Sequence, residues 1–162
     1  MPQISKGGKY VFGWSRVGPK GAVPVPPEAL EEYGLRPGGR AILASGSRTT
    51  GGVTVSTKRL MAGSRLACVL AAHPELAHRR GRAGVPLRFK GRLYAWVAVD
   101  RRGSLCLPPH TLAAYGIAPG DRLLVIRGSN VAFVMGLKGP LIDFAARHPG
   151  IPLFTGAERR QC

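Results

Sequence analysis

The sequence has 162 residues, enough for one ordinary domain or two very small ones. Hydrophobic residues make up 44% of it, which excludes a chain too polar to fold. With 24 Lys and Arg against 8 Asp and Glu, the formal net charge is +16, which favours a polyanionic partner such as nucleic acid. No segment has the length and apolar character of a membrane span or signal peptide, so we expect no membrane partner.

Side chains that carry catalytic or metal chemistry are sparse. The cysteines are Cys68, Cys106 and Cys162, an odd number without metal-ligand spacing. This pattern predicts neither a disulfide framework nor a zinc site, but thiols in a reducing cytoplasm. We expect no enzyme, no cofactor and no metal, since nucleophile triads, paired carboxylates and phosphate-binding glycine loops are missing from the sequence. His73 and His148 each precede a proline and are interpreted as structural residues at helix ends.

The first half of the chain predicts six elements in order. An aromatic and valine-rich strand leads through a basic turn into a short apolar strand. A Pro-Pro pair then opens a short helix that Gly34 ends, and Pro37-Gly38 predicts a type II turn before a hairpin. A further helix closes the half. The expected bounds are Tyr10–Val17, Ala22–Val25, a helix through Leu30 and Tyr33, Arg40–Ser45 with Val53–Ser56, and about Gly63–Ala72.

The second half repeats the first at a constant offset of 82, which takes Gly21 to Gly103. Between Gly21–Leu43 and Gly103–Val125, nine of 23 aligned positions are identical and most others exchange one aliphatic residue for another. The offset also pairs Trp14 with Trp96, and it slips after the hairpin turn, where the first copy has a longer loop. The second copy predicts elements at Leu93–Val99, Ser104–Leu107, a helix through Leu112 and Tyr115, Arg122–Arg127 with Val131–Met135, and Pro140–Arg147.

Each copy is only about 45 residues through its hairpin, and a unit of that size rarely buries enough apolar area to fold alone. We therefore expect a mainly β fold with short helices, in which the hairpins of the two copies interleave into a pseudo-twofold β-barrel. The predicted organisation is a first repeat at 1–76, a basic connector at 77–92, a second repeat at 93–154 and a C-terminal tail at 155–162.

The segment GSLCLPPHTLAAYGIAPGDRLLV, residues 103–125, resembles the AbrB/MazE/SpoVT swapped-hairpin DNA-binding family. Two tandem copies in one chain are also similar to the MraZ proteins. The resemblance implies a swapped-hairpin fold, double-stranded DNA as partner and a role in transcription regulation. Family members usually have Arg after the turn glycine and basic residues on the short helix. Here the corresponding residues are Ala22, Ser104, Glu31, Glu32, Ala113 and Ala114.

Two basic sets are the candidate DNA-binding residues, because clustered Lys and Arg gain affinity by displacing the counterions condensed on DNA. The first set surrounds the turn before each short strand and the second lies in the connector, for which a disordered linker is an even alternative. The first set comprises Arg16, Lys20, Arg101 and Arg102; the second comprises Arg79, Arg80, Arg82, Arg88, Lys90 and Arg92.

Several paired residues are assigned to structure as well as to binding. Arg40 and Arg122 follow the Pro-Gly turns, where a structural role is at least as favoured as a DNA contact. Trp14, Trp96 and the helix tyrosines are expected in the core. With one Asn and two Gln, direct base recognition is limited, which favours phosphate contacts and DNA shape.

The expected protein is a cytoplasmic, nucleoid-associated DNA-binding regulator, with a homodimer of the tandem chain left open. Two alternatives stay open from the sequence: a protein-interaction module such as an antitoxin-like partner of a toxin, and a binder of structured RNA. The short C-terminal segment with Arg159 and Arg160 is unlike the acidic tails of antitoxins.

Overall fold

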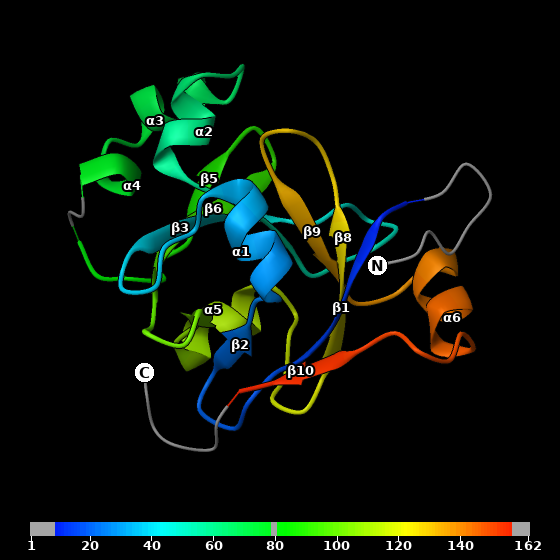
Figure 1. Ribbon diagram of the computed structural model, residues 1–162. Coiled ribbons are helices and arrows are strands. Elements are labelled where there is room, and N and C mark those ends of the chain that lie inside the picture. The colour runs from blue at the N-terminus through cyan, green and yellow to red at the C-terminus, as the bar shows by residue number, and fades with distance from the viewer. Residues whose placement is uncertain (1–8, 79–80, 157–162) are drawn as a thin grey trace.

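The computed structural model describes residues 9–78 and 81–156. Within these residues ten strands form one sheet that curls into a nearly closed barrel, with six short helices around it (Figure 1). The strands are β1 (Val11–Arg16), β2 (Ala22–Pro24), β3 (Arg40–Ser45), β4 (Val53–Ser56), β5 (Leu87–Phe89), β6 (Arg92–Val99), β7 (Ser104–Cys106), β8 (Arg122–Arg127), β9 (Phe133–Gly136) and β10 (Leu153–Thr155). The helices are α1 (Pro27–Tyr33), α2 (Lys58–Ala62), α3 (Ala67–Ala72), α4 (Glu75–His78), α5 (Pro109–Ala114) and α6 (Pro140–Ala146).

Strands from the two sequence copies are interleaved around the barrel, mostly as pairs of strands from one copy followed by a pair from the other. The order is β10-β1-β8-β9-β4-β3-β6-β7-β2, with β5 added to β6. Strand β1 of the first copy pairs with β8 of the second, and β6 of the second copy pairs with β3 of the first. Two further cross-copy pairs, β4 with β9 and β2 with β7, join equivalent strands. The predicted interleaving of the two copies is confirmed.

The registers obey the same twofold relation. Trp14 lies opposite Leu124, while its repeat equivalent Trp96 lies opposite Ile42. Ile42 is in turn the repeat equivalent of Leu124, so the two pairings are the same contact seen from each copy. At the centre of the β2–β7 pair, Val23 lies opposite its own repeat partner Leu105. At the centre of the β4–β9 pair, Thr54 lies opposite Val134, its equivalent at an offset of 80. The offset between equivalent residues falls from 82 to 80 here because the loop of the first hairpin is two residues longer than that of the second.

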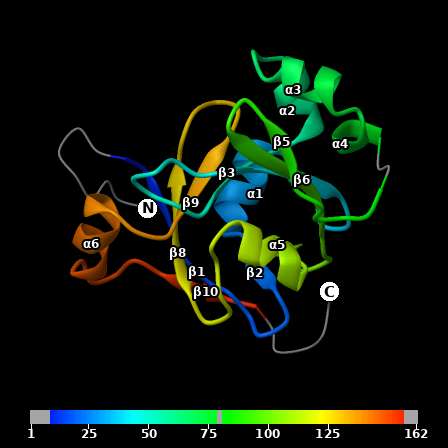
Figure 2. The same ribbon diagram turned by 180° about the vertical axis from the view of Figure 1, so that it is seen from behind.

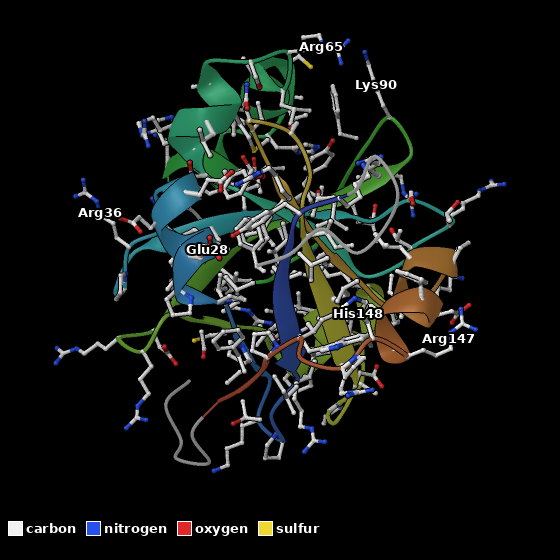
Figure 3. The ribbon with its side chains drawn as sticks, turned by 45° about the vertical axis from the view of Figure 1, so that its right-hand side comes forward. Glu28, Arg36, Arg65, Lys90, Arg147 and His148 are labelled. Atoms are coloured by element: carbon white, nitrogen blue, oxygen red, sulfur yellow. The ribbon has the colours of Figure 1, made fainter. Side chains whose placement is uncertain are left out.

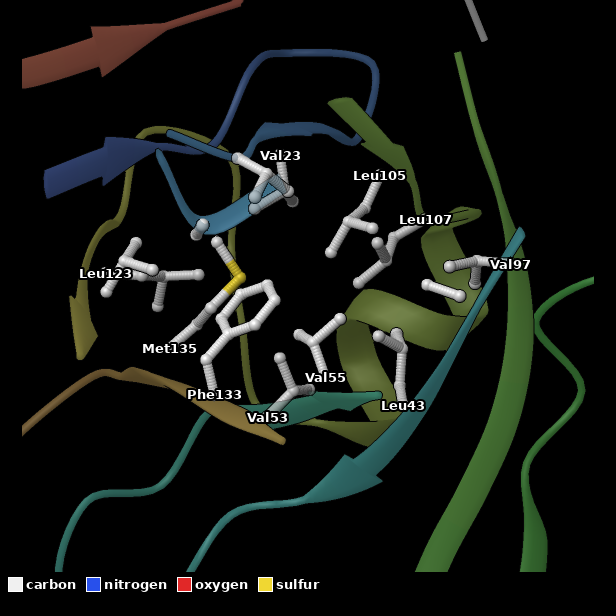
Figure 4. Packing of buried hydrophobic residues seen from close by; sticks show 14 of the residues in the cluster. Val23, Leu43, Val53, Val55, Val97, Leu105, Leu107, Leu123, Phe133 and Met135 are labelled. Carbon is white, nitrogen blue, oxygen red and sulfur yellow. The ribbon is translucent and has the colours of Figure 1, made fainter. Parts of the chain in front are cut away.

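A single central core is built from equivalent residues of both copies. The cluster contains the pairs Val23 and Leu105, Leu43 and Val125, and Tyr33 and Tyr115, all buried. Figure 4 shows side chains from β2, β7, β4 and β9 meeting in the barrel interior. Since half of this core comes from each copy, neither copy encloses an apolar interior by itself.

Helices cover the outer faces of the barrel at two equivalent places. In the first copy, Ile42 of β3 packs with Met61, Val69 and Leu76 of α2, α3 and α4. In the second, Leu124 of β8 packs with Ile142 and Ala145 of α6. Figure 2 shows these two helical groups on opposite sides of the barrel.

Several elements differ from the sequence-based expectation. The helix predicted at about Gly63–Ala72 is shorter, because only α3 lies within that range. Helices α2 and α4 were not predicted; α2 begins where the Thr57 hydroxyl accepts the Leu60 amide hydrogen, and Gly63 ends it. Helix α6 lies where predicted. Strands β5 and β10 were not predicted; β5 forms a hairpin with β6, and β10 pairs in parallel with β1.

The expectation of reduced thiols is wrong for Cys106, which is disulfide-bonded, while Cys68 is free and exposed. Sequence spacing gave no indication of a bond, because a disulfide requires only that two Cα atoms come within about 4.4–6.8 Å in space. The argument from thiols for a reducing compartment therefore no longer applies. Across residues 9–78 and 81–156, the helices are all too short or too polar to cross a bilayer.

Candidate nucleic-acid interface

The two basic turns, Gly18–Gly21 and Asp100–Gly103, have the same hydrogen-bond pattern. The Gly18 amide donates to the Ala22 carbonyl at 2.9 Å, and the Asp100 amide donates to the Ser104 carbonyl at 2.9 Å. Within each turn, the closing glycine amide donates to the first carbonyl at 3.1 Å. The second turn has an additional constraint, since the Asp100 carboxylate accepts the amides of Arg102 and Ser104. The twofold relation therefore extends from the barrel to the turns.

The β2–β7 ribbon fixes the spacing of these turns. Because β2 and β7 are antiparallel, the turns precede them at opposite ends of the ribbon. Gly21 lies beside Leu107, and Gly103 lies beside Val25. Four residues therefore separate the turns along the ribbon, or about 14 Å at roughly 3.4 Å per residue. This is close to the width of the B-DNA major groove, about 12 Å.

Only the turns, and not the ribbon between them, present side chains to solvent. Val23 and Leu105 point into the core, so the alternation of a strand turns Ala22 and Ser104 outward. These two residues are nevertheless buried, and Gly156 lies against them. Contact with a long polyanion would therefore be made at the two ends of the ribbon.

The predicted turn cations are all exposed and lack ion pairs. Arg16, Lys20, Arg101 and Arg102 are exposed, and no carboxylate in the described part of the chain lies within salt-bridge distance of them. Arg16 also lies opposite Arg122 in the β1–β8 register. Uncompensated like charges repel one another, and phosphate groups would relieve that repulsion.

The connector cations lie elsewhere. Arg79 and Arg80 fall outside the described residues. Lys90 is at the tip of the β5–β6 hairpin, and Arg88 and Arg92 flank it. Strand β6 places this tip about 24 Å from the second basic turn, seven residues at roughly 3.4 Å each. Arg82 lines a pocket beside Trp96. The structure thus does not bring Arg82, Arg88, Lys90 and Arg92 together with the turn cations.

Two of the three acidic residues of α1, Glu28 and Glu32, have partners away from the turns. Glu32 forms a 2.6 Å ion pair with Arg127, and this hydrogen-bonded guanidinium lowers the pKa of the Glu32 carboxyl. Glu28 accepts a hydrogen bond from the Tyr10 hydroxyl, which raises the pKa of Tyr10. Glu32 and Arg127 come from different copies, so this ion pair links the two copies.

The paired Arg and Trp residues stack on one another. The guanidinium of Arg122 lies 4.7 Å from the ring centroid of Trp14, and that of Arg40 lies 5.3 Å from Trp96. Trp14 is 5% exposed, and Trp96 is half-buried against the outer cluster of the first copy. The structural role considered for these arginines is therefore observed, since each cation covers one tryptophan.

The tyrosines lie in the core as expected. Tyr33 and Tyr115 are 2% and 6% exposed. Their hydroxyls donate to the carbonyls of Ser129 and Leu93, and burial raises the pKa of both.

Sequence reasoning did not single out Arg36, which belongs to the turn that packs on the second basic turn. The Gly38 amide donates to the carbonyls of Val99 and Asp100 at 2.9 and 3.3 Å. The alignment of the two repeats could have pointed to Arg36, because the equivalent residue of the second copy is the uncharged Ala118.

Over the described ranges, no three His, Cys, Asp or Glu side chains converge as a metal-binding group would require.

Comparison of the chain with protein-family models, with curated proteins and with solved structures finds no match.

Proposed function

We propose that this chain binds double-stranded DNA through its two basic turns and acts as a transcription regulator. The observation that carries the proposal is the placement of exposed cations, without ion pairs in the described part of the chain, at the two ends of the β2–β7 ribbon, where Lys20 and Arg102 are repeat equivalents. A DNA duplex has its own local twofold axes, so two equivalent turns can contact its two strands in the same way.

The formal charge of +16 supports the same partner, because a cationic protein concentrates DNA around it. The resemblance to the AbrB/MazE/SpoVT family supports it independently, since the interleaved pairing is the arrangement that this resemblance implies. Contacts to phosphates and to DNA shape are the proposed mode of recognition. A regulator of this kind acts on chromosomal DNA, and the proposal implies a cytoplasmic, nucleoid-associated protein.

The test is the salt dependence of binding to duplex DNA. If about six phosphates are neutralised, the slope of log affinity against log salt is about −5. Replacing Arg16, Lys20, Arg101 and Arg102 by Ala removes four contacts and should flatten the slope by about 3.6. The matched control replaces four other exposed cations by Ala, namely Arg48, Arg65, Lys138 and Arg147.

The turn variant and the control lose the same net charge, so they separate a local interface from general attraction. Equal slopes for the two variants would refute the assignment to the turns, and a wild-type affinity independent of salt would refute DNA binding. Competition by duplex RNA of the same length tests the RNA alternative. Selecting bound sequences from random duplex DNA, with the mass of the complex, tests regulation at specific sites and the possible homodimer.

A further inference from the structure

A pocket of about 270 Å³ lies between the turn after α1, the start of α2 and the β3–β6 face, so Trp96 of the second copy also lines it. Four cations line it and no acidic residue does: Arg36, Arg40, Lys58 and Arg59. Its floor is apolar, with Ile42 and Leu76 buried below. Pockets for drug-sized ligands usually measure about 300–1,000 Å³. This one is therefore sized for a small, strongly anionic group.

Two of the arginines are held in place by their surroundings. The half-buried Arg40 stacks on Trp96, which also lines the pocket. The Arg59 guanidinium lies against the backbone at Gly34, where an added Cβ would be 2.8 Å from its Nη2 atom. An arginine already held in position loses less freedom when its fork of N–H donors meets a phosphate.

Three of the four lining cations are exposed. Arg36, Lys58 and Arg59 are exposed, and none of them pairs with a carboxylate of the described chain. Surface cations without a shared cavity are normally just solvated. Here the cations line one pocket, so that a single bound ligand can interact with all of them.

The two copies carry different residues at this site. Arg36 corresponds to Ala118, and Gly39 corresponds to Asp121, both at the offset of 82. The Asp121 carboxylate accepts the Ala118 amide at 2.8 Å, so the second copy has an acid where the first has a glycine. The cationic pocket is therefore a property of the first copy and not of the shared fold.

We propose that this pocket binds phosphate groups. The phosphate can belong to the DNA backbone or to a free phosphorylated small molecule, and both use the same Arg and Lys donors. The proposal goes beyond duplex binding by the turns, because binding of a free phosphate compound does not require that the chain bind DNA.

The experiment is a calorimetric titration of the full chain with inorganic pyrophosphate. The main variant, Arg36→Ala with Gly39→Asp, gives the first copy the residues of the second. An aspartate there has the Arg36 amide as its equivalent partner, so the fold should be retained. The second variant is Lys58→Ala with Arg59→Ala. The control, Arg65→Ala with Arg147→Ala, also lowers the net charge by two, at sites far from Arg36 in Figure 3.

We expect saturable pyrophosphate binding by the wild type and the control, weakened by about tenfold or more in both pocket variants. Binding that survives in both pocket variants would overturn the proposal. The source of the phosphate is then identified with labelled duplex DNA. If pyrophosphate displaces DNA and the variant Lys58→Ala with Arg59→Ala flattens the salt slope by about 1.8, the group is a backbone phosphate.

If pyrophosphate binds without affecting the DNA complex, the ligand is a free phosphorylated compound. Flattening of the slope by the pocket variants alone, without pyrophosphate binding, supports a backbone phosphate. The proposal would be overturned if the wild type does not bind pyrophosphate and the pocket variants show the same DNA salt slope as the control. Failure of DNA binding by the basic turns appears separately, in the turn variant.

Discussion

Three glycines with nearly the same φ angle allow the closeness of the contact between β2 and β7 to be tested by comparing the stability of alanine variants. Gly21, Gly38 and Gly103 have φ angles of 86°, 85° and 84°. An alanine at each position meets the same left-handed backbone penalty, about 1–2 kcal/mol. The surroundings of the added methyl group differ, so differences among the three variants report those surroundings.

The added Cβ meets nothing within 4 Å at Gly38, so Gly38→Ala gives the backbone penalty alone. At Gly103 it would be 2.6 Å from the Leu30 Cδ1 atom, a side-chain end that can shift for about 0.5–1.5 kcal/mol. At Gly21 it would be 2.0 Å from the Leu107 carbonyl oxygen. The ribbon must then open there, with loss of the Leu107 amide to Gly21 carbonyl hydrogen bond.

The expected losses of unfolding free energy are about 1.5 kcal/mol for Gly38→Ala, about 2.5 for Gly103→Ala and about 4 for Gly21→Ala. In a chain of this size, 1 kcal/mol corresponds to about 2–4 °C in Tm. Urea unfolding and thermal melts, followed by circular dichroism, measure both quantities. Equal losses for the three variants, or a smaller loss for Gly21→Ala than for Gly38→Ala, would refute the close contact between the copies.

Two further predictions concern buried polar groups. The Ser15 hydroxyl is buried without a hydrogen-bond partner in the described chain, so Ser15→Ala should raise the free energy of unfolding by about 1 kcal/mol. Ser56→Ala, which removes a 2.7 Å bond to the Val131 carbonyl, should lower it in the same urea experiment, and a loss in both variants would contradict the reasoning. Burial raises the pKa of Tyr115 above 10.0, so the folded chain keeps this proton at a pH where the unfolded chain loses it. Stability should therefore fall above pH 10, by up to about 1.4 kcal/mol per pH unit. Tyr115→Phe should be less stable at pH 7, having lost its bond to Leu93, but should show a shallower decline; an unchanged decline would show that other groups cause it.

The repeat in the sequence was sufficient to predict the interleaved barrel. An offset of 82 with no gap means that cross-copy strand pairs share one register, and the structure shows it at Trp14 and Trp96. Pro27 and Pro109 begin α1 and α5 as their position after another proline indicated. These features are local or are repeated twice, so each is supported by two independent parts of the sequence.

Elements that occur in only one copy were missed. Strand β10 has three residues after Pro152, and it forms because the free edge of β1 accepts it, which no local pattern reveals. The hairpin of β5 with β6 lies in a segment whose charge suggested a linker, although Lys90-Gly91 makes a tight turn there. The disulfide of Cys106 depends on distances in the folded chain.

The candidate site was predictable only in part. The basic turns follow from the charge of the sequence and from the repeat, and the structure shows their exposure and spacing. The cationic pocket was not foreseen, because Arg36 and Arg59 lie far apart in the sequence, outside the predicted helices and strands, and line one pocket only in the folded chain. Comparing the copies for charge, at Arg36 against Ala118, would have indicated it.

The union of both hairpins in one polypeptide makes formation of the barrel a first-order process. A barrel assembled from two separate chains would dissociate and unfold on dilution, because its stability depends on the concentration of protomers. Here each half meets the other at the high effective concentration set by a short tether. Because the two halves are separate parts of one chain, each can carry its own substitutions, as Arg36 and Ala118 do at equivalent positions. A duplicated fold can in this way present two different surfaces, whereas a symmetric homodimer presents the same surface twice.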